Sequence, residues 1–141
     1  MLDSLEPFVG YIDGSSRSTQ NLSSVVWVIF SPSGELVSFQ GICIIWSMNN
    51  IVEYSALIKL LFDAISLGIC WIIVRMDSQL IILHLTSVYT IQNPTILCMF
   101  LRVHILEMHF EYIQYRHISR NFNTLIDYLA NYVLNRHLRH M

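Results

Sequence analysis

The sequence predicts a single α/β domain built on a mixed five-stranded sheet flanked by helices. Segments with strand and helix character follow one another in the order βββαβααβα, which is typical of a mixed sheet with helices on its faces. The chain has 141 residues and shows no internal repeat, low-complexity block or linker. This length suits one domain with a sizeable core. We therefore expect one domain over residues 1–141, with its core at about 7–137.

Three strands are expected in the first third of the chain. The segment FVGYID (8–13) has strand composition and ends at Asp13, and a polar loop, GSSRSTQNLSS (14–24), is expected after it. VVWVIF (25–30) and LVSFQGICII (36–45) are the second and third strands. The SPSGE segment between them has the proline and glycine of a hairpin turn.

Helical periodicity then begins near Asn49 and ends near Gly68, a residue type common at helix C-termini. The apolar face of this helix would carry Ala56, Leu57, Leu60, Leu61, Ala64 and Ile65. The later elements are expected as a buried strand at 70–74, a helix at 78–85, a helix from Pro94, a strand at 110–118 and a closing helix at about 123–137.

The composition argues against a membrane span and against a strongly basic surface. Hydrophobic residues make up 54% of the chain and charged residues 13%, but a spanning helix needs about 18 or more apolar residues without charges. Glu53, Lys59 and Asp63 interrupt the first long apolar region. The formal net charge of −2 gives no basic footprint for nucleic acid.

The cysteines, tryptophans and most histidines show no metal-ligand or cofactor pattern. The cysteines lie in apolar runs without a CxxC pair, so we expect reduced core residues and no zinc site. The tryptophans are also expected in the core, with a stacking platform for bases as the alternative for one of them. The cysteines are Cys43, Cys70 and Cys98, the tryptophans are Trp27, Trp46 and Trp71, and the histidines without a ligand pattern are His84, His104, His109, His137 and His140.

Four acids lie at the ends of the expected elements. Asp13 ends the first strand, Glu53 lies in the first turn of the first helix, Asp77 ends the fourth strand, and Asp127 lies near the start of the last helix. In an α/β sheet, strand ends and adjacent helix starts converge on one crevice. Carboxylates gathered there repel one another unless cations lie between them, and such hard oxygen ligands suit Mg²⁺ or Mn²⁺.

Each acid also has a structural alternative. Asn50 could cap the first helix, with Glu53 three residues later as its capping-box partner. Asp77 could cap the next helix, and Asp127 would gain from the positive end of its own helix. Asp13, which precedes a glycine, could belong to a turn.

The order of the motifs favours the joint explanation. The matching pieces are YIDGSSR (11–17), NNIVEYSAL (49–57), DSQL (77–80) and RHISRNFNTLIDYLAN (116–131). With these pieces in this order, the sequence resembles the ribonuclease H type 1 domain, especially the form found in plant retroelement polyproteins and their derived single-domain proteins. The resemblance covers about residues 7–135 and implies a ribonuclease H-like fold with sheet order 3-2-1-4-5.

The resemblance also implies an activity. It implies a metal-dependent endonuclease that cuts the RNA strand of RNA–DNA hybrids, with two Mg²⁺ ions, or Mn²⁺ in their place, held by Asp13, Glu53, Asp77 and Asp127. His117 corresponds to a mobile histidine that moves protons or helps the product leave. The residues implied to contact the hybrid are Gly14, Ser15, Asn50, Ser78 and Gln79.

Several positions depart from the family pattern. Ser23, Ser24, Val25 and Val26 replace a glycine-rich strand entry, Ser119 replaces a proline, Ile126 replaces a small residue, and Arg75 and Met76 replace small or polar residues. These departures support an alternative, a degenerate retroelement-derived domain that binds nucleic acid with little or no catalysis. A third hypothesis is a core-rich interaction domain whose apolar surface needs a partner. We expect an intracellular protein, in the nucleus or cytoplasm, either alone or within a larger reverse-transcriptase polyprotein.

Overall fold

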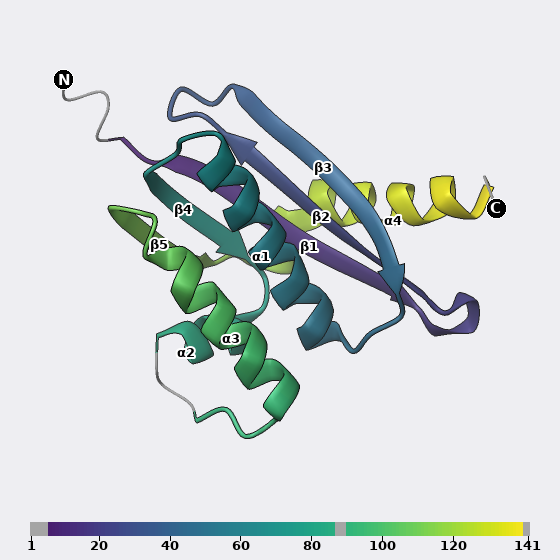
Figure 1. Ribbon diagram of the computed structural model, residues 1–141. Helices are drawn as coiled ribbons and strands as arrows, with labels where there is room; N and C mark the ends of the chain where they lie inside the picture. Colours follow the sequence, from purple (N-terminus) through teal and green to yellow (C-terminus); the bar gives the residue numbers. More distant parts are fainter. Residues whose placement is uncertain (1–5, 87–89, 140–141) are drawn as a thin grey trace.

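The computed structural model describes residues 6–86 and 90–139. Five strands form one mixed sheet in the order β3-β2-β1-β4-β5, with helices on both faces (Figure 1). The strands are β1 (Phe8–Arg17), β2 (Leu22–Phe30), β3 (Leu36–Ile45), β4 (Trp71–Met76) and β5 (Tyr112–His117). The helices are α1 (Asn49–Ser66), α2 (Gln79–Leu85), α3 (Pro94–Glu107) and α4 (Thr124–Arg139), with short 3₁₀ turns at Ser18–Gln20 and Arg120–Asn123. The predicted fold class and strand order are confirmed.

The polar segment 14–24 was predicted as loop, but only Ser18–Asn21 forms a turn and the rest is strand, so the prediction was wrong for most of the segment. β1 continues to Arg17 and pairs antiparallel with β2, with Ser15 opposite Ser24. Glycine and serine have low strand propensity, but here the serine hydroxyls find partners. The Ser16 hydroxyl lies 2.9 Å from that of Ser23, and Ser24 Oγ donates to the Ala130 carbonyl at 2.8 Å. Long-range pairing therefore extends the sheet through this polar segment.

The two faces of β2 are buried under different helices. Its odd-numbered residues join the main core, which α1 fills with Leu57, Leu60 and Leu61. Its even-numbered residues Val26 and Val28 pack against α4 in a second, smaller cluster. Because opposite residues share a face of the sheet, the β2–β3 register places Phe39, which is paired with Val28, on the α4 side.

The predicted turns and helix ends agree with the structure. Gly34, in the SPSGE hairpin, has a φ of 91°, and the Gly34 amide donates to the Ser31 carbonyl at 2.9 Å. Gly68, which follows the C-cap residue Leu67 of α1, has a φ of 76°. Both backbones lie in the region where residues with a side chain are strained. Among the residues that the structure describes, no helix is long and apolar enough to cross a bilayer.

Several side chains expected in the core lie elsewhere. Cys70 and Cys98 are exposed and Cys43 is half-buried. Trp27 is buried as expected, but Trp46 is 39% exposed. Cys98 lies on α3, where several apolar side chains are also exposed, namely Leu97, Leu101 and Ile105. Trp71 is half-buried, and His140 lies outside the described residues.

Candidate active site

A divergence of two central strands creates the space for the site. β1 and β4 run parallel and pair from Phe8–Ile72 to Tyr11–Arg75, and no pair follows. β1 continues beside β2 beyond that point, so Asp13 lies within the strand and not at its end. β4 ends at Met76, and Asp77 follows directly. The two aspartates therefore face the gap that opens where the parallel pairing stops.

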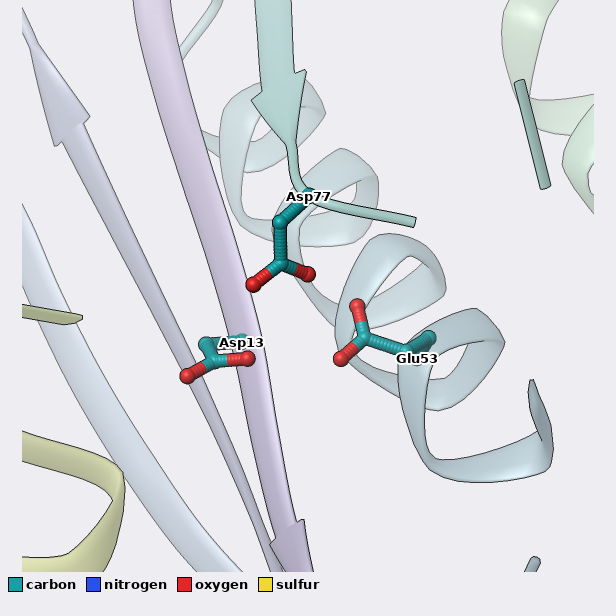
Figure 2. Close-up of side chains that lie close together, drawn as sticks. All are labelled: Asp13, Glu53 and Asp77. Atoms are coloured by element: carbon teal, nitrogen blue, oxygen red, sulfur yellow. The ribbon is translucent and has the colours of Figure 1, made fainter. Parts of the chain in front are cut away.

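Three acids meet at this gap. Asp13 from β1, Glu53 from α1 and Asp77 after β4 each offer a carboxylate oxygen, and these oxygens all lie within 4.8 Å of one another. Figure 2 shows the three side chains pointing toward one another. Glu53 was predicted in the first turn of this helix, but it is the fifth residue of α1 and lies just beyond that turn.

The fourth acid, Asp127, lines a pocket together with Glu53 and Asp77. Asp127 is in the first turn of α4, and its proximity contributes to the raised pKa of Asp13. The pocket has a volume of about 290 Å³. It is lined by Gly14, Ser15, Ser16, Asn49, Asn50, Val52, Glu53, Asp77, Ser78, Arg120 and Asp127. The structure thus brings all four predicted acids to one place.

Burial and mutual repulsion favour protonated carboxyls in this cluster. Burial, followed by the charge of Asp77, raises the pKa of Asp13 to about 7 from an ordinary 3.8. Burial, followed by the charges of Asp13 and Asp77, raises the pKa of Glu53 well above its ordinary value. The Gly14 amide opposes both shifts. The fold therefore holds these acids together at an electrostatic cost.

Two oxygens of the cluster are suited to a cation. Asp13 Oδ2 and Glu53 Oε2 are buried and receive no hydrogen bond from any group in the described part of the chain. Within residues 6–86 and 90–139, no salt bridge joins these acids to a lysine, arginine or histidine. Buried oxygens normally have partners, and carboxylate oxygens are the ligands that Mg²⁺ and Mn²⁺ prefer. The residues present therefore fit a divalent cation.

The structural alternatives for three of the acids are wrong. Met48 is the N-cap of α1, and no side chain caps that helix, so Asn50 and Glu53 form no capping box. Ser78, not Asp77, caps α2, since its hydroxyl accepts from the Ile81 amide at 3.4 Å. Asp13 lies in a strand and not in a turn. Only Asp127 keeps its favourable place at a helix N-terminus.

The predicted substrate-contacting residues mostly line the pocket. Gly14, Ser15, Asn50 and Ser78 do so, whereas Gln79 is exposed at the start of α2 and is not part of the lining. A side chain at Gly14 would collide with Val52, so this glycine lets the first turn of α1 approach β1 closely. Ser15 Oγ donates to Asn131 Oδ1 at 3.1 Å and so links β1 to α4.

His117 lies at the margin of the site. It ends β5, pairs with Met76 and is exposed. Met76 directly precedes Asp77, which places the histidine one strand away from the acids. It does not line the pocket. Its role in catalysis stays a prediction.

Comparison with known proteins identifies the family. Residues 11–133 match the reverse transcriptase-like protein family. This chain belongs to that family. A ribonuclease HI from Halobacterium salinarum is 34% identical over 125 residues, which cover 89% of this chain and 63% of the relative. A bifunctional protein of Mycobacterium tuberculosis is 32% identical over 122 residues, and the chain spans 33% of its length.

Solved structures of ribonucleases H type 1 are similar to this chain over nearly their whole length. The crystal structure of RNase H1 from Halobacterium salinarum matches with a TM-score of 0.86 at 33% identity, over 92% of this chain and 98% of that one. LC11-RNase H1 in complex with an RNA/DNA hybrid matches with a TM-score of 0.84 at 28% identity, over 93% and 99%. The predicted resemblance is thus confirmed.

Sequence reasoning missed four polar residues of this family member's site. Arg120, Asn49 and Ser16 line the pocket. Asn123 is only 1% exposed, and its amide nitrogen lies 3.4 Å from the Ile12 carbonyl and 3.5 Å from Asp77 Oδ2. Its position four residues before Asp127 was the available signal, because side chains at that spacing share a helical face.

Residues that depart from the ribonuclease H pattern have specific places in the fold. Ser24 ties β2 to the carbonyl of Ala130 in α4. Ile126 and Val26 are both larger than the residues that the family usually has at these positions, and they pack together in the second, smaller cluster. Arg75 donates to the hydroxyl of a β1 tyrosine at 3.0 Å. Nothing in the structure explains Ser119. Most departures are therefore compensated by packing or hydrogen bonding.

Asn123→Ala is expected to destabilise the fold by about 1–3 kcal/mol, because it removes the hydrogen bonds of this buried amide to the Ile12 carbonyl and to Asp77. The measurement is the free energy of unfolding in urea. Asn121→Ala is the matched control, since Asn121 is exposed in the same turn, and it should change stability by no more than about 0.5 kcal/mol. Equal effects from the two variants would show that Asn123 does not support the site.

Proposed function

We propose that this chain is a divalent-metal-dependent endonuclease that hydrolyses the RNA strand of RNA–DNA hybrids. The observation that carries the proposal is the meeting of Asp13, Glu53 and Asp77, whose ligand oxygens lie within 4.8 Å of one another at the gap between β1 and β4. Two of these carboxylates have a buried oxygen with no donor in the described structure. The likeness to ribonuclease HI and to a hybrid-bound RNase H1 supports the substrate class.

The four acids are the proposed ligands of two ions, Mg²⁺ or, in its place, Mn²⁺. Asp13 is central, because Asp77 and Asp127 contribute to its raised pKa and Asp13 in turn raises the pKa of Glu53. When bound, such ions polarise the scissile phosphate and lower the pKa of water. The chain supplies a fixed, partly buried set of oxygens for them.

The polar lining of the pocket is the proposed contact surface for the nucleic-acid backbone. Arg120 lines the same pocket as three of the acids, and its guanidinium group would contact a phosphate there. Asn49, Asn50 and Ser78 offer amide and hydroxyl groups suited to ribose 2′-hydroxyls. Contacts of this kind recognise the shape and sugar of the duplex and not its sequence. His117, at the margin, would act in proton movement or product release.

Origin, context and location are further parts of the proposal. We infer a retroelement of plant type as the origin, a longer reverse-transcriptase product as one natural context, and the nucleus or cytoplasm as the location. The reverse transcriptase-like family description supports the second of these, the reverse-transcriptase context.

The test is cleavage of a labelled RNA–DNA hybrid by purified protein, with and without Mg²⁺ or Mn²⁺. We expect RNA-strand products only from the hybrid and only with the metal. Single-stranded RNA, duplex RNA and duplex DNA of the same sequence serve as controls and should stay intact. Hybrid binding without any product, at every metal concentration, would favour the degenerate binding domain instead.

A further inference from the structure

Strand β3 forms an unprotected edge of the sheet. In the part of the chain that the structure describes, it pairs with β2 alone (Figure 1). Its ten residues, LVSFQGICII, include no charged residue and no proline. Sheet edges are usually protected from pairing with other chains by charges, proline, short length or a covering element. This edge is long and uncharged, and the irregularity in its pairing with β2 lies near its start, where Ile29 pairs with Ser38 and Phe30 with Leu36.

The α4 side of this edge is apolar and partly uncovered. The register places Leu36, Phe39 and Ile45 on that side, opposite Phe30, Val28 and Leu22. Leu36 is 58% exposed, Phe39 41% and Ile45 74%. Helix α4 packs over the β1–β2 region and reaches β3, but it leaves these side chains in solvent.

Helix α4 projects beyond the edge. Figure 1 shows it crossing behind the sheet, with its C-terminal end past β3. Arg136 and Arg139 are exposed on this projecting end, and Glu35 is exposed at the turn where β3 begins. The edge thus has exposed apolar side chains and an exposed acid, Glu35, at its start. The basic end of α4 projects past β3 and, in the described chain, contacts nothing beyond it.

We propose that β3 pairs antiparallel with β3 of a second copy of this chain, about a two-fold axis near Gly41. The axis would be perpendicular to the sheet, so α4 of each copy would lie on the same side. The projecting α4 end would then cover the partner's Phe39 and bring Arg136 and Arg139 toward the partner's Glu35. An uncharged strand opposes no like charges in this arrangement, and the same patch serves both copies. Two five-stranded sheets become one continuous sheet.

The test is the oligomeric state across a wide range of protein concentrations, measured by sedimentation equilibrium. The parent chain should form dimers, and Phe39→Lys should weaken association about a hundredfold, or about tenfold for each of two symmetric contacts. Leu101→Lys is the matched control, because Leu101 is 50% exposed on α3, away from β3, and its dimer should persist.

Hydrogen exchange provides a readout that does not depend on the variant folding. Amides of β3 should exchange more slowly in concentrated than in dilute parent protein. A parent that stays monomeric at all concentrations would overturn the proposal, as would Phe39→Lys dimers of unchanged affinity. Loss of the dimer in Leu101→Lys alone would place the interface on α3 and overturn it as well.

Discussion

Asp13→Asn is expected to reduce metal-dependent hybrid cleavage by about 1000-fold or more. Asp13 is 4% exposed and is the acid toward which the other three converge. A bound divalent ion stabilises transition-state charge by several kcal/mol, and each 1.36 kcal/mol is about a factor of ten in rate. Asparagine keeps the size of the side chain but lacks the charge that holds the ion. The measurement is the single-turnover cleavage rate at saturating Mg²⁺.

Glu6→Gln is the control for this loss. It removes one negative charge from an exposed position ahead of β1, outside the pocket lining. Its cleavage rate should stay within about a factor of two of the parent, because exposed charges are screened by salt. If Asp13→Asn folds normally and cuts at the parent rate, the metal-ligand role of Asp13 is wrong.

In the absence of divalent metal, the folded protein is expected to lose stability as the pH rises from about 4 to 8. Folding raises the pKa of Asp13 from 3.8 to about 7, so the folded state binds a proton that the unfolded state has released. The associated stability is fully present below about pH 4 and is lost as the pH rises through about 7. At about 1.4 kcal/mol per pKa unit, the loss reaches up to about 4 kcal/mol.

The measurement is urea unfolding in EDTA at a series of pH values, taken as the difference between the parent and Asp13→Asn. The difference between their free energies of unfolding isolates Asp13 from the other titrating groups. As the pH rises, the variant should become more stable relative to the parent. Adding Mg²⁺ at pH 8 should restore stability to the parent and not to the variant. A difference that does not change between pH 4 and 8 would show that Asp13 titrates normally in the folded protein.

Much of the fold follows from local patterns in the sequence. Apolar periodicity located α1 and its buried face, and turn chemistry located the hairpin at Gly34 and the end of α1 before Gly68. The segment after Asp13 could not be predicted in this way. Its glycine and serines have low strand propensity, and only pairing with β2 and contacts with α4 make it a strand.

The same distinction between local sequence patterns and long-range packing applies to the candidate site. The acids could be named because each lies within one of the short motifs whose order along the chain is visible in the sequence. Arg120 could not, since its place depends on how the 3₁₀ turn before α4 packs and on which side of that turn faces the pocket. The capping alternatives for Glu53 and Asp77 failed for a related reason. A helix can begin one or two residues away from the residue best suited to cap it.

The most direct test of the central claim is anomalous diffraction from crystals of the protein grown with Mn²⁺. The account predicts manganese peaks within ligand distance of Asp13, Glu53 and Asp77, and their loss in Asp13→Asn crystals grown in the same way. Parent crystals with manganese elsewhere and no peak between these three carboxylates would contradict it.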